Sequence, residues 1–202
     1  MIQLTIIRHG QTVENATHLC QGQQQGKLSE TGIQQAKKVA ERLRDEPIDL
    51  FYSSDLQRTR DTSAAILVYH PELKLIPDPL LRERYMASWE GKPFPDRWHW
   101  DYLPDGAETN EDLLERANLF IEKIRKQHDG KHVVAVTHGG LIRALWTLIT
   151  GKPVSAYFSW EEPKNTAVSR IELHDNGKHQ ILEMNNTDHL SEQTPGTSPV
   201  SG

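Results

Sequence analysis

The sequence predicts an α/β fold: a three-layer α/β/α sandwich whose sheet is mainly parallel and has an antiparallel edge strand. Three observations lead to this prediction. Short apolar segments typical of buried strands alternate with longer segments of helical periodicity. Such alternation is typical of a parallel sheet that is covered on both faces. Near the carboxyl end, two strand-like segments flank Asn176-Gly177, a dipeptide that favours a tight two-residue hairpin turn.

The first strand is expected at residues 2–7 (IQLTII), which are mostly apolar and β-branched, as in a strand buried on both faces. Ser29 is the expected N-cap of a helix that Pro47 stops. The apolar positions of that helix are Ile33, Ala36, Val39, Ala40 and Leu43. This first strand and helix set the pattern that the rest of the chain repeats.

A second strand is expected at residues 48–53 (IDLFYS), followed by a helix with Asp55 as its cap. One face of that helix carries Leu56, Thr59, Ser63, Ile66 and Leu67. Residues 84–109 are rich in Pro, Trp and charge and show no clean period, which predicts an irregular insertion. Specificity elements tend to lie in such segments.

The pattern recurs in a helix at about 111–127, a strand at 132–137 (HVVAVT) and a helix that Gly151 terminates. The predicted hairpin occupies 167–185. We expect residues 1–186 to form a single domain. Residues 187–202 are rich in Ser, Thr, Pro and Gly and have little to bury, so they are expected to form a disordered tail.

The composition limits the classes of partner. A formal net charge of −5 gives no general attraction for nucleic acid or an anionic membrane, so an anionic ligand requires a local cluster of cations. Cys20 is the only cysteine, which excludes an intramolecular disulfide and fits a reducing compartment. No signal peptide and no apolar run near the ~18 residues of a membrane span is visible. We therefore expect a soluble cytoplasmic protein, whose oligomeric state the sequence leaves open.

Polar side chains follow two of the predicted strands. Arg8 and His9 come directly after the first strand, and His138 follows the strand at 132–137. Ligands of such folds bind at the carboxyl ends of the strands, so the two histidines are expected to meet at one edge. Each is followed by glycine, which leaves helix-start N–H groups free for an anion. The shared edge is therefore predicted to bind an anion.

Four ordered blocks, RHGQTVEN, SSDLQRTRDT, LRER and VTHGG, resemble the histidine phosphatase superfamily, which includes cofactor-dependent phosphoglycerate mutases. The resemblance spans roughly residues 2–173. It implies that His9 is the nucleophile and that Arg8, Arg58 and His138 bind the phosphoryl oxygens, whose charge such cations stabilise. It implies that Glu83 is the general acid and base. It implies no metal and no cofactor.

The resemblance also suggests residues that contact the substrate or its phosphate: Asn15, Gln21, Gly22 and Gly139. Capping of a loop is an equally good explanation for Asn15 and Gln21. The carboxylates that compete with Glu83 for its role are Asp78, Glu90 and Asp105, and the arginines interpreted as structural or solvated are Arg60, Arg82 and Arg84.

The chain departs from the family pattern in two places. Ala87 stands where relatives commonly have glycine, and the block at 104–109 (PDGAET) is altered. Both lie beside the insertion, whose aromatic residues either wall a substrate pocket or anchor the loop to the body. These residues are Trp89, Phe94, Trp98, Trp100 and Tyr102, and Arg97 and His99 lie among them.

The predicted function is hydrolysis of a small phosphomonoester through a phosphohistidine intermediate. The chain resembles broad-specificity, α-ribazole and TIGAR-like sugar phosphatases about equally. Two alternatives stay open at this point. One is a phosphoglycerate mutase, which typically carries longer insertions than this short chain has. The other is a phosphate-binding module of the same fold that has lost turnover, although all five expected catalytic residues are present.

Overall fold

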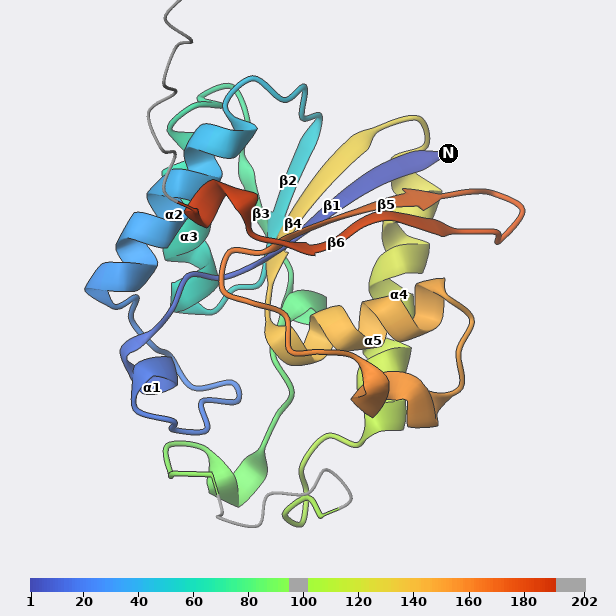
Figure 1. Cartoon of the computed structure of the whole chain (residues 1–202). Helices are drawn as coiled ribbons and strands as arrows, with labels where there is room; N and C mark the ends of the chain where they lie inside the picture. Colours follow the sequence, from blue (N-terminus) through green and yellow to red (C-terminus); the bar gives the residue numbers. More distant parts are fainter. Residues whose placement is uncertain (95–101, 192–202) are drawn as a thin grey trace, which may run out of the picture.

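In the computed structural model, which describes residues 1–94 and 102–191, a six-stranded sheet lies between two layers of helices (Figure 1). The strand order is β3-β2-β4-β1-β5-β6. The strands are β1 (Ile2–Arg8), β2 (Leu50–Ser53), β3 (Leu75–Pro77), β4 (His132–Thr137), β5 (Val168–Leu173) and β6 (Gln180–Asn186). The first four run parallel, and β5 pairs antiparallel with both β1 and β6. The predicted α/β sandwich is confirmed.

Two pairs of helices cover the sheet. The α2 helix (Glu30–Leu43) and α3 (Gln57–Leu67) pack on one face, and α4 (Asn110–Gln127) and α5 (Gly139–Ile149) pack on the other. Shorter elements are α1 (Val13–Ala16) and the 3₁₀ turns η1 (Pro79–Leu81), η2 (Ala87–Trp89), η3 (Val154–Ser159) and η4 (Asp188–Leu190). None of the described helices is long and apolar enough to cross a membrane.

The register of the central strands positions the site. Residue Arg8, the last of β1, pairs with Thr137, the last of β4, and Ser53 at the end of β2 pairs with Val136. These strands are buried on both faces, as their apolar sequences predict. The three strands therefore end together, and the residues that follow them gather at one edge.

The α2 helix agrees with the prediction from sequence except at Ile33, the first position of the expected apolar face. The Ser29 side chain caps it by accepting from the amide of Gly32, and the helix ends at Leu43, before Pro47. The expected apolar face is buried except for Ile33, which is 44% exposed. Gly32 packs against the backbone of Gln11, so the next position along the helix turns outward.

The start of α3 and the hairpin turn were both predicted incorrectly. The N-cap of α3 is Leu56, which makes no side-chain cap bond, whereas Asp55 pairs with Arg82. The β5–β6 connection is a loop over 174–179 instead of a two-residue turn. Its Gly177 has a φ of +74° and donates its amide to the carbonyl of His174. Glycine thus ends a wider turn here.

The start of the carboxyl-terminal tail also differs from expectation. Residues 187–191 are ordered against α2: Lys38 Nζ donates to the carbonyl of Leu190, and Arg42 Nη1 lies 3.2 Å from His189 Nδ1. The predicted disorder is therefore wrong for 187–191. The rest of the expected tail lies outside the described residues.

The short edge strand β3 had no sequence signal, because it contains only three residues and ends at Pro77. In the expected insertion, 84–109, the described residues form η2 and otherwise irregular chain, as predicted. The positions Arg97, Trp98, His99 and Trp100 lie outside the described residues.

Candidate active site

The two histidines predicted to share an edge do so. The rings of His9 and His138 lie 5.1 Å apart, centroid to centroid, just beyond the ends of β1 and β4. Beside them is a pocket of about 520 Å³. The sequence-predicted site residues that line it are Arg8, His9, Asn15, Gln21, Gly22, Arg58, Glu83 and Gly139. The ninth, His138, is fully buried behind this wall.

His9 is held as a neutral imidazole. Its Nδ1 lies 2.7 Å from the carbonyl oxygen of Gly10, which can only accept, so Nδ1 carries the proton and Nε2 keeps its lone pair. Burial, and after it the charges of Arg58 and Arg8, hold the pKa of His9 well below its ordinary value. An unprotonated Nε2 is the form that a nucleophilic histidine needs.

Arg58 is 1% exposed and is fixed by three acceptors. Its Nε donates to His138 Nδ1 at 3.1 Å, and Nη1 and Nη2 donate to the carbonyls of Gln24 and Gly22. Burial lowers the pKa of Arg58 to about 10, which leaves it charged at neutral pH. The helix α3 thus delivers a rigid cation to the pocket.

His138 orients Arg58 in this structure. Because its Nδ1 accepts from Arg58, its Nε2 carries the proton and donates to Ser54 Oγ at 2.9 Å. Burial lowers the pKa of His138 well below its ordinary value. Both ring nitrogens are therefore engaged with protein, whereas the family resemblance implied a direct contact with phosphoryl oxygens.

Arg8 reaches the pocket from the end of β1. Its Nη1 donates to Glu162 Oε1 at 3.0 Å and to the carbonyl of Pro163. Its Nε is buried and has no hydrogen-bond partner among the described residues. A buried donor without an acceptor is costly, so an oxyanion placed beside Arg8 would remove that cost.

Glu83 is the one of the four candidate carboxylates that lines the pocket. Its Oε2 accepts from the amide of Gly140 at 3.1 Å and its Oε1 from the amide of Arg84 at 2.7 Å. Of the competitors, Asp78 binds Lys123 and caps η1, Glu90 accepts from the amides of Gln23 and Met86, and Asp105 is exposed. The geometry therefore favours Glu83 as the proton carrier.

Because Gly140 has no side chain, the carboxylate of Glu83 can lie against it. We therefore expect Gly140→Ala to impair catalysis. A Cβ added there would lie 2.2 Å from Glu83 Oε1, so the carboxylate must move. A displacement of about 1 Å typically costs about 100-fold in rate, which steady-state kinetics will detect. At Gly139, by contrast, the nearest atom to an added Cβ is Arg8 Nε at 3.5 Å, an ordinary contact. Equal losses for Gly139→Ala and Gly140→Ala would contradict this account.

The side chains of Asn15 and Gln21 make hydrogen bonds within their own loop, as the loop-capping explanation predicts. The side chain of Asn15 accepts from the amide of Thr12, and its Nδ2 donates to Gln21 Oε1 at 3.3 Å. Gln21 Nε2 donates to Glu14 Oε2. Both side chains also line the pocket, so this network holds polar groups at its wall.

Two of the three motif glycines, Gly10 and Gly140, have a different physical role from the one expected. The amide of Gly10 donates to Thr62 Oγ1, and that of Gly140 donates to Glu83, so neither is free for an anion. A Cβ at Gly10 would lie 2.6 Å from the carbonyl oxygen of Gly32. Close packing against α2 explains that glycine.

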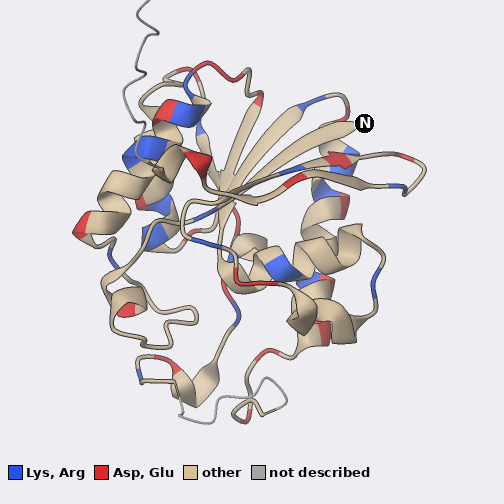
Figure 2. Ribbon diagram, in the orientation of Figure 1, with Lys and Arg blue, Asp and Glu red and all other residues tan. Residues whose placement is uncertain are grey.

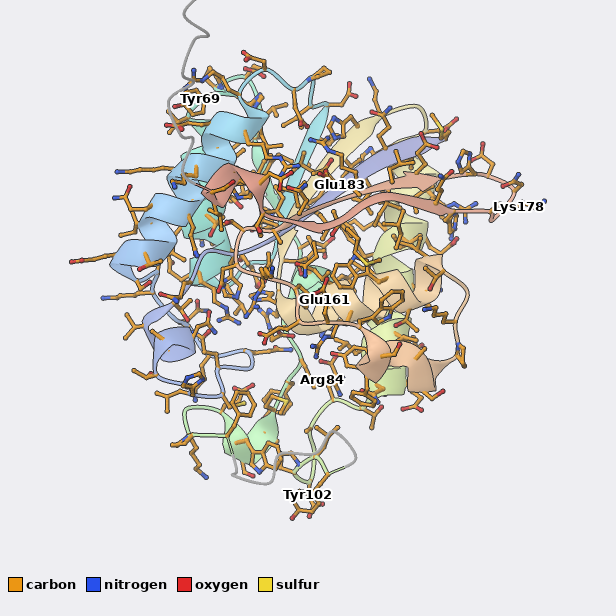
Figure 3. All side chains as sticks on the ribbon, viewed as in Figure 1. Tyr69, Arg84, Tyr102, Glu161, Lys178 and Glu183 are labelled. Atoms are coloured by element: carbon orange, nitrogen blue, oxygen red, sulfur yellow. The ribbon has the colours of Figure 1, made fainter. Side chains whose placement is uncertain are left out.

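The sequence analysis interpreted Arg84 as structural or solvated, but it is 3% exposed and lines the pocket. Figure 3 shows it below the sheet, in the region between α1 and α5. Its guanidinium donates to the Glu108 carbonyl and to Asn110 Oδ1, and its Cζ lies 5.1 Å from the centre of the Tyr157 ring. No local pattern marks such a residue, because all three contacts are distant in sequence.

Ala87, the departure from the family pattern, has a φ of +47°. This is the left-handed region that favours glycine. Ala87 therefore adopts the backbone conformation that a glycine at this position would adopt more readily. The altered block at 104–109 begins α4, since Thr109 forms a capping box with Asp112.

Acidification is expected to destabilise the protein below about pH 6.5. His9 and His138 are neutral in the folded state, where their pKa is lowered, but take up protons when unfolded. The free energy of unfolding should therefore fall by about 1 kcal/mol per pH unit for each of them. Urea unfolding from about pH 7.5 to about pH 5.5 measures this slope. His138→Gln should show a shallower decline, and an unchanged slope would contradict the buried neutral state.

Within the described residues, no group of three or more His, Cys, Asp or Glu side chains is arranged to hold a metal ion. The charged groups of the pocket come from separate segments instead. Figure 2 shows Lys and Arg positions of several segments around the lower end of the sheet, among them α5.

The sequence matches the histidine phosphatase superfamily (branch 1) over residues 4–187. It is 32% identical over 205 residues to phosphoglycerate mutase-like protein 4 of Arabidopsis thaliana, covering 94% of this chain and 87% of that protein. It is 35% identical over 165 residues to the metal-independent phosphoserine phosphatase of Arabidopsis thaliana, covering 73% and 68%. A mycobacterial glucosyl-3-phosphoglycerate phosphatase, solved in complex with VO3, has a TM-score of 0.83 at 27% identity, covering 92% and 99%.

The family match and the named relatives agree with the residues and geometry of the pocket. The family match covers most of the chain, and both a sequence relative and a structural neighbour are named phosphatases. The family expected from the four motif blocks is confirmed. The chain belongs to the histidine phosphatase superfamily, branch 1.

Proposed function

We propose that this protein is a phosphatase that hydrolyses a small phosphorylated metabolite through a phosphohistidine at His9. The observation that carries the proposal is the neutral imidazole of His9, whose Nε2 is unprotonated beside the buried Arg58 and the partly buried Arg8. Glu83 lines the same pocket. A nucleophile, a cationic cradle and a proton carrier are what transfer of a phosphoryl group requires.

In the first step, His9 Nε2 attacks phosphorus and the bond from phosphorus to the ester oxygen breaks. Glu83, as the carboxylic acid, gives its proton to the leaving alkoxide. Arg8 and Arg58 face the charge that develops on the equatorial oxygens. His138 has a positioning role, because it holds the Arg58 guanidinium by its Nε.

In the second step, the Glu83 carboxylate takes a proton from water, and the oxygen attacks phosphorus. The bond to His9 Nε2 breaks, and inorganic phosphate leaves. The carboxylic acid and the neutral histidine are then both restored, so the cycle closes without another reactant.

The mutase reaction would return the phosphoryl group to an organic acceptor instead of water. A relative that is named phosphoglycerate mutase-like is consistent with that alternative. The short insertion at 84–109 favours access of water, and the relatives named phosphatases support hydrolysis. A binding module without turnover is the third possibility, which the unprotonated His9 and the placed Glu83 make less attractive.

We also propose that the protein acts in the cytoplasm as one domain, now extended to residue 191, on small molecules and not on nucleic acid or membranes. The lone Cys20, buried beside the pocket, fits a reducing compartment. A net charge of −5 opposes general binding to nucleic acid or anionic lipid.

The experiment that tests the proposed function is phosphate release from a panel of phosphomonoesters with a chelator present. The panel includes p-nitrophenyl phosphate, phosphoglycerates, sugar bisphosphates, phosphoserine and α-ribazole phosphate. Turnover that survives the chelator supports a phosphatase that needs no metal. Interconversion of phosphoglycerates without release would identify a mutase, and phosphate binding without either activity would identify a binding module.

A further inference from the structure

Among the described residues, four arginines line the pocket, which is more positive charge than one phosphoryl group requires. They are Arg8, Arg58, Arg84 and Arg143. The charges of Arg58 and Arg8 act on His9, where they lower its pKa. The charges of Arg84 and Arg143, together with the opposite charge of Glu83, act on the hydroxyl of Tyr157, another residue of the wall. The cations therefore form two groups, one beside His9 and one beside Tyr157.

The two arginines of the second group differ in what holds them. The guanidinium of Arg84 donates from both terminal nitrogens to α4 and the residues before it, and it stacks on Tyr157. Arg84 therefore has a structural role in the wall of the pocket. Arg143 is partly exposed and lies on α5, one turn beyond the Gly139-Gly140 start of the helix.

The geometry of α5 carries the Arg143 guanidinium toward the pocket. Side chains of a helix tilt toward its N-terminus, and the N-terminus of α5 is where Gly139 and Gly140 meet Arg8 and Glu83. The Nε of Arg143 donates to the carbonyl of Glu161 at 3.3 Å, which orients the planar fork. Figure 3 shows Glu161 in the same part of the molecule, between the sheet and Arg84.

The carboxylates of the pocket leave a net positive charge. The described lining contains the acids Glu83 and Glu162 against the four arginines. Glu162 pairs with Arg8 at 3.0 Å, and Glu83 accepts from two backbone amides. With Glu83 as the carboxylic acid of the proposed first step, Glu162 and a phosphoryl dianion at His9 balance three of the four arginine charges, which leaves one positive charge for another anion.

We propose that Arg143 binds a second anionic group of the substrate, a carboxylate or a second phosphate, and so determines specificity. This inference rests on the proposed function, since it places the scissile phosphate at His9. The ligand class is therefore a phosphomonoester that carries another negative charge on a short organic body. A planar guanidinium suits both anions, because its fork of donors matches their oxygens.

The test compares three substrates that share a three-carbon skeleton: glycerol 3-phosphate, 3-phosphoglycerate and glycerol 1,3-bisphosphate. The wild-type enzyme should prefer one or both of the doubly charged substrates, and the preferred one distinguishes carboxylate from phosphate. Arg143→Ala should lower kcat/KM for that substrate by about 10- to 100-fold, mainly through KM, as for loss of a hydrogen bond to a charged group. Glycerol 3-phosphate should change by less than about threefold.

Two further variants separate recognition from structure. Arg143→Lys keeps the charge without the fork and should recover part of the loss. Arg60→Ala removes an exposed arginine of α3 that does not line the pocket, and should leave kcat/KM unchanged for all three substrates. A loss by Arg143→Ala that is equal for all three substrates, or a wild-type enzyme indifferent to the second anion, would overturn the proposal.

Binding measured without turnover distinguishes this inference from the proposed function. In the His9→Ala background, calorimetry should show that Arg143→Ala weakens the preferred ligand by the same factor and spares glycerol 3-phosphate. If the wild-type enzyme releases no phosphate while this pattern of binding holds, the hydrolase proposal fails and the role of Arg143 stands. If phosphate is released but the binding pattern is absent, the role of Arg143 fails alone.

Discussion

Phosphate release by the His9→Ala variant is expected to fall by at least about 10⁴-fold, because the variant lacks the imidazole that attacks phosphorus. His9 is set apart by its unprotonated Nε2 and by its position at the end of β1, where Arg8 and Arg58 converge. The measurement is steady-state release from p-nitrophenyl phosphate and from the best substrate of the panel.

A trapping experiment makes the prediction specific to a covalent intermediate. Acid-labile, base-stable label from a phosphorus-labelled substrate should appear on the wild-type chain in a rapid quench and be absent from His9→Ala. His174→Ala, on the β5–β6 hairpin and remote from the pocket, is the matched control and should retain both label and turnover. Label on His9→Ala would show that the nucleophile has been misassigned.

The Glu83→Gln variant is expected to lose about 10² to 10⁴ in kcat on alkyl phosphates, the usual worth of a placed general acid and base. Glutamine keeps the shape, and its single acceptor oxygen can keep one of the two bonds from the amides of Gly140 and Arg84, which limits the structural disturbance. What it removes is the proton given to the leaving alkoxide and the base that activates water.

Leaving-group dependence separates the two halves of that role. p-Nitrophenolate needs little protonation, so Glu83→Gln should still show a burst of about one p-nitrophenol per enzyme, followed by slow turnover as water attacks without a base. The wild-type enzyme is the reference for the burst. A variant that turns over both kinds of substrate like the wild type would transfer the role to another carboxylate, and Glu90, which is close to Gly22, would be examined next.

The fold could be predicted from sequence because its signals are local. Continuous apolar runs mark β1 and β4 as strands buried on both faces, and Ser29 marks the start of α2 through one side-chain bond. The errors arose where the signal was weak or was overridden. The three-residue β3 has no period, and Asp55 pairs with Arg82 instead of capping α3.

The catalytic candidates could be predicted because parallel strands share an edge at their carboxyl ends. That rule alone brings His9 and His138 together from sequence positions far apart, and the motif blocks add Arg8, Arg58 and Glu83. The sequence by itself thus determined the architecture, the family and the residues of the candidate site.

The tertiary structure decided what each of those residues does. It turned His138 away from the pocket to hold Arg58, engaged the Gly10 amide with Thr62, and placed Arg143 at the wall. It also paired Arg8 with Glu162, a residue distant from it in the sequence. The physical reason is that protonation state, burial and hydrogen-bond partner depend on atoms supplied by distant segments. Periodicity and capping, by contrast, depend on neighbours a few residues away, so the sequence reveals them directly.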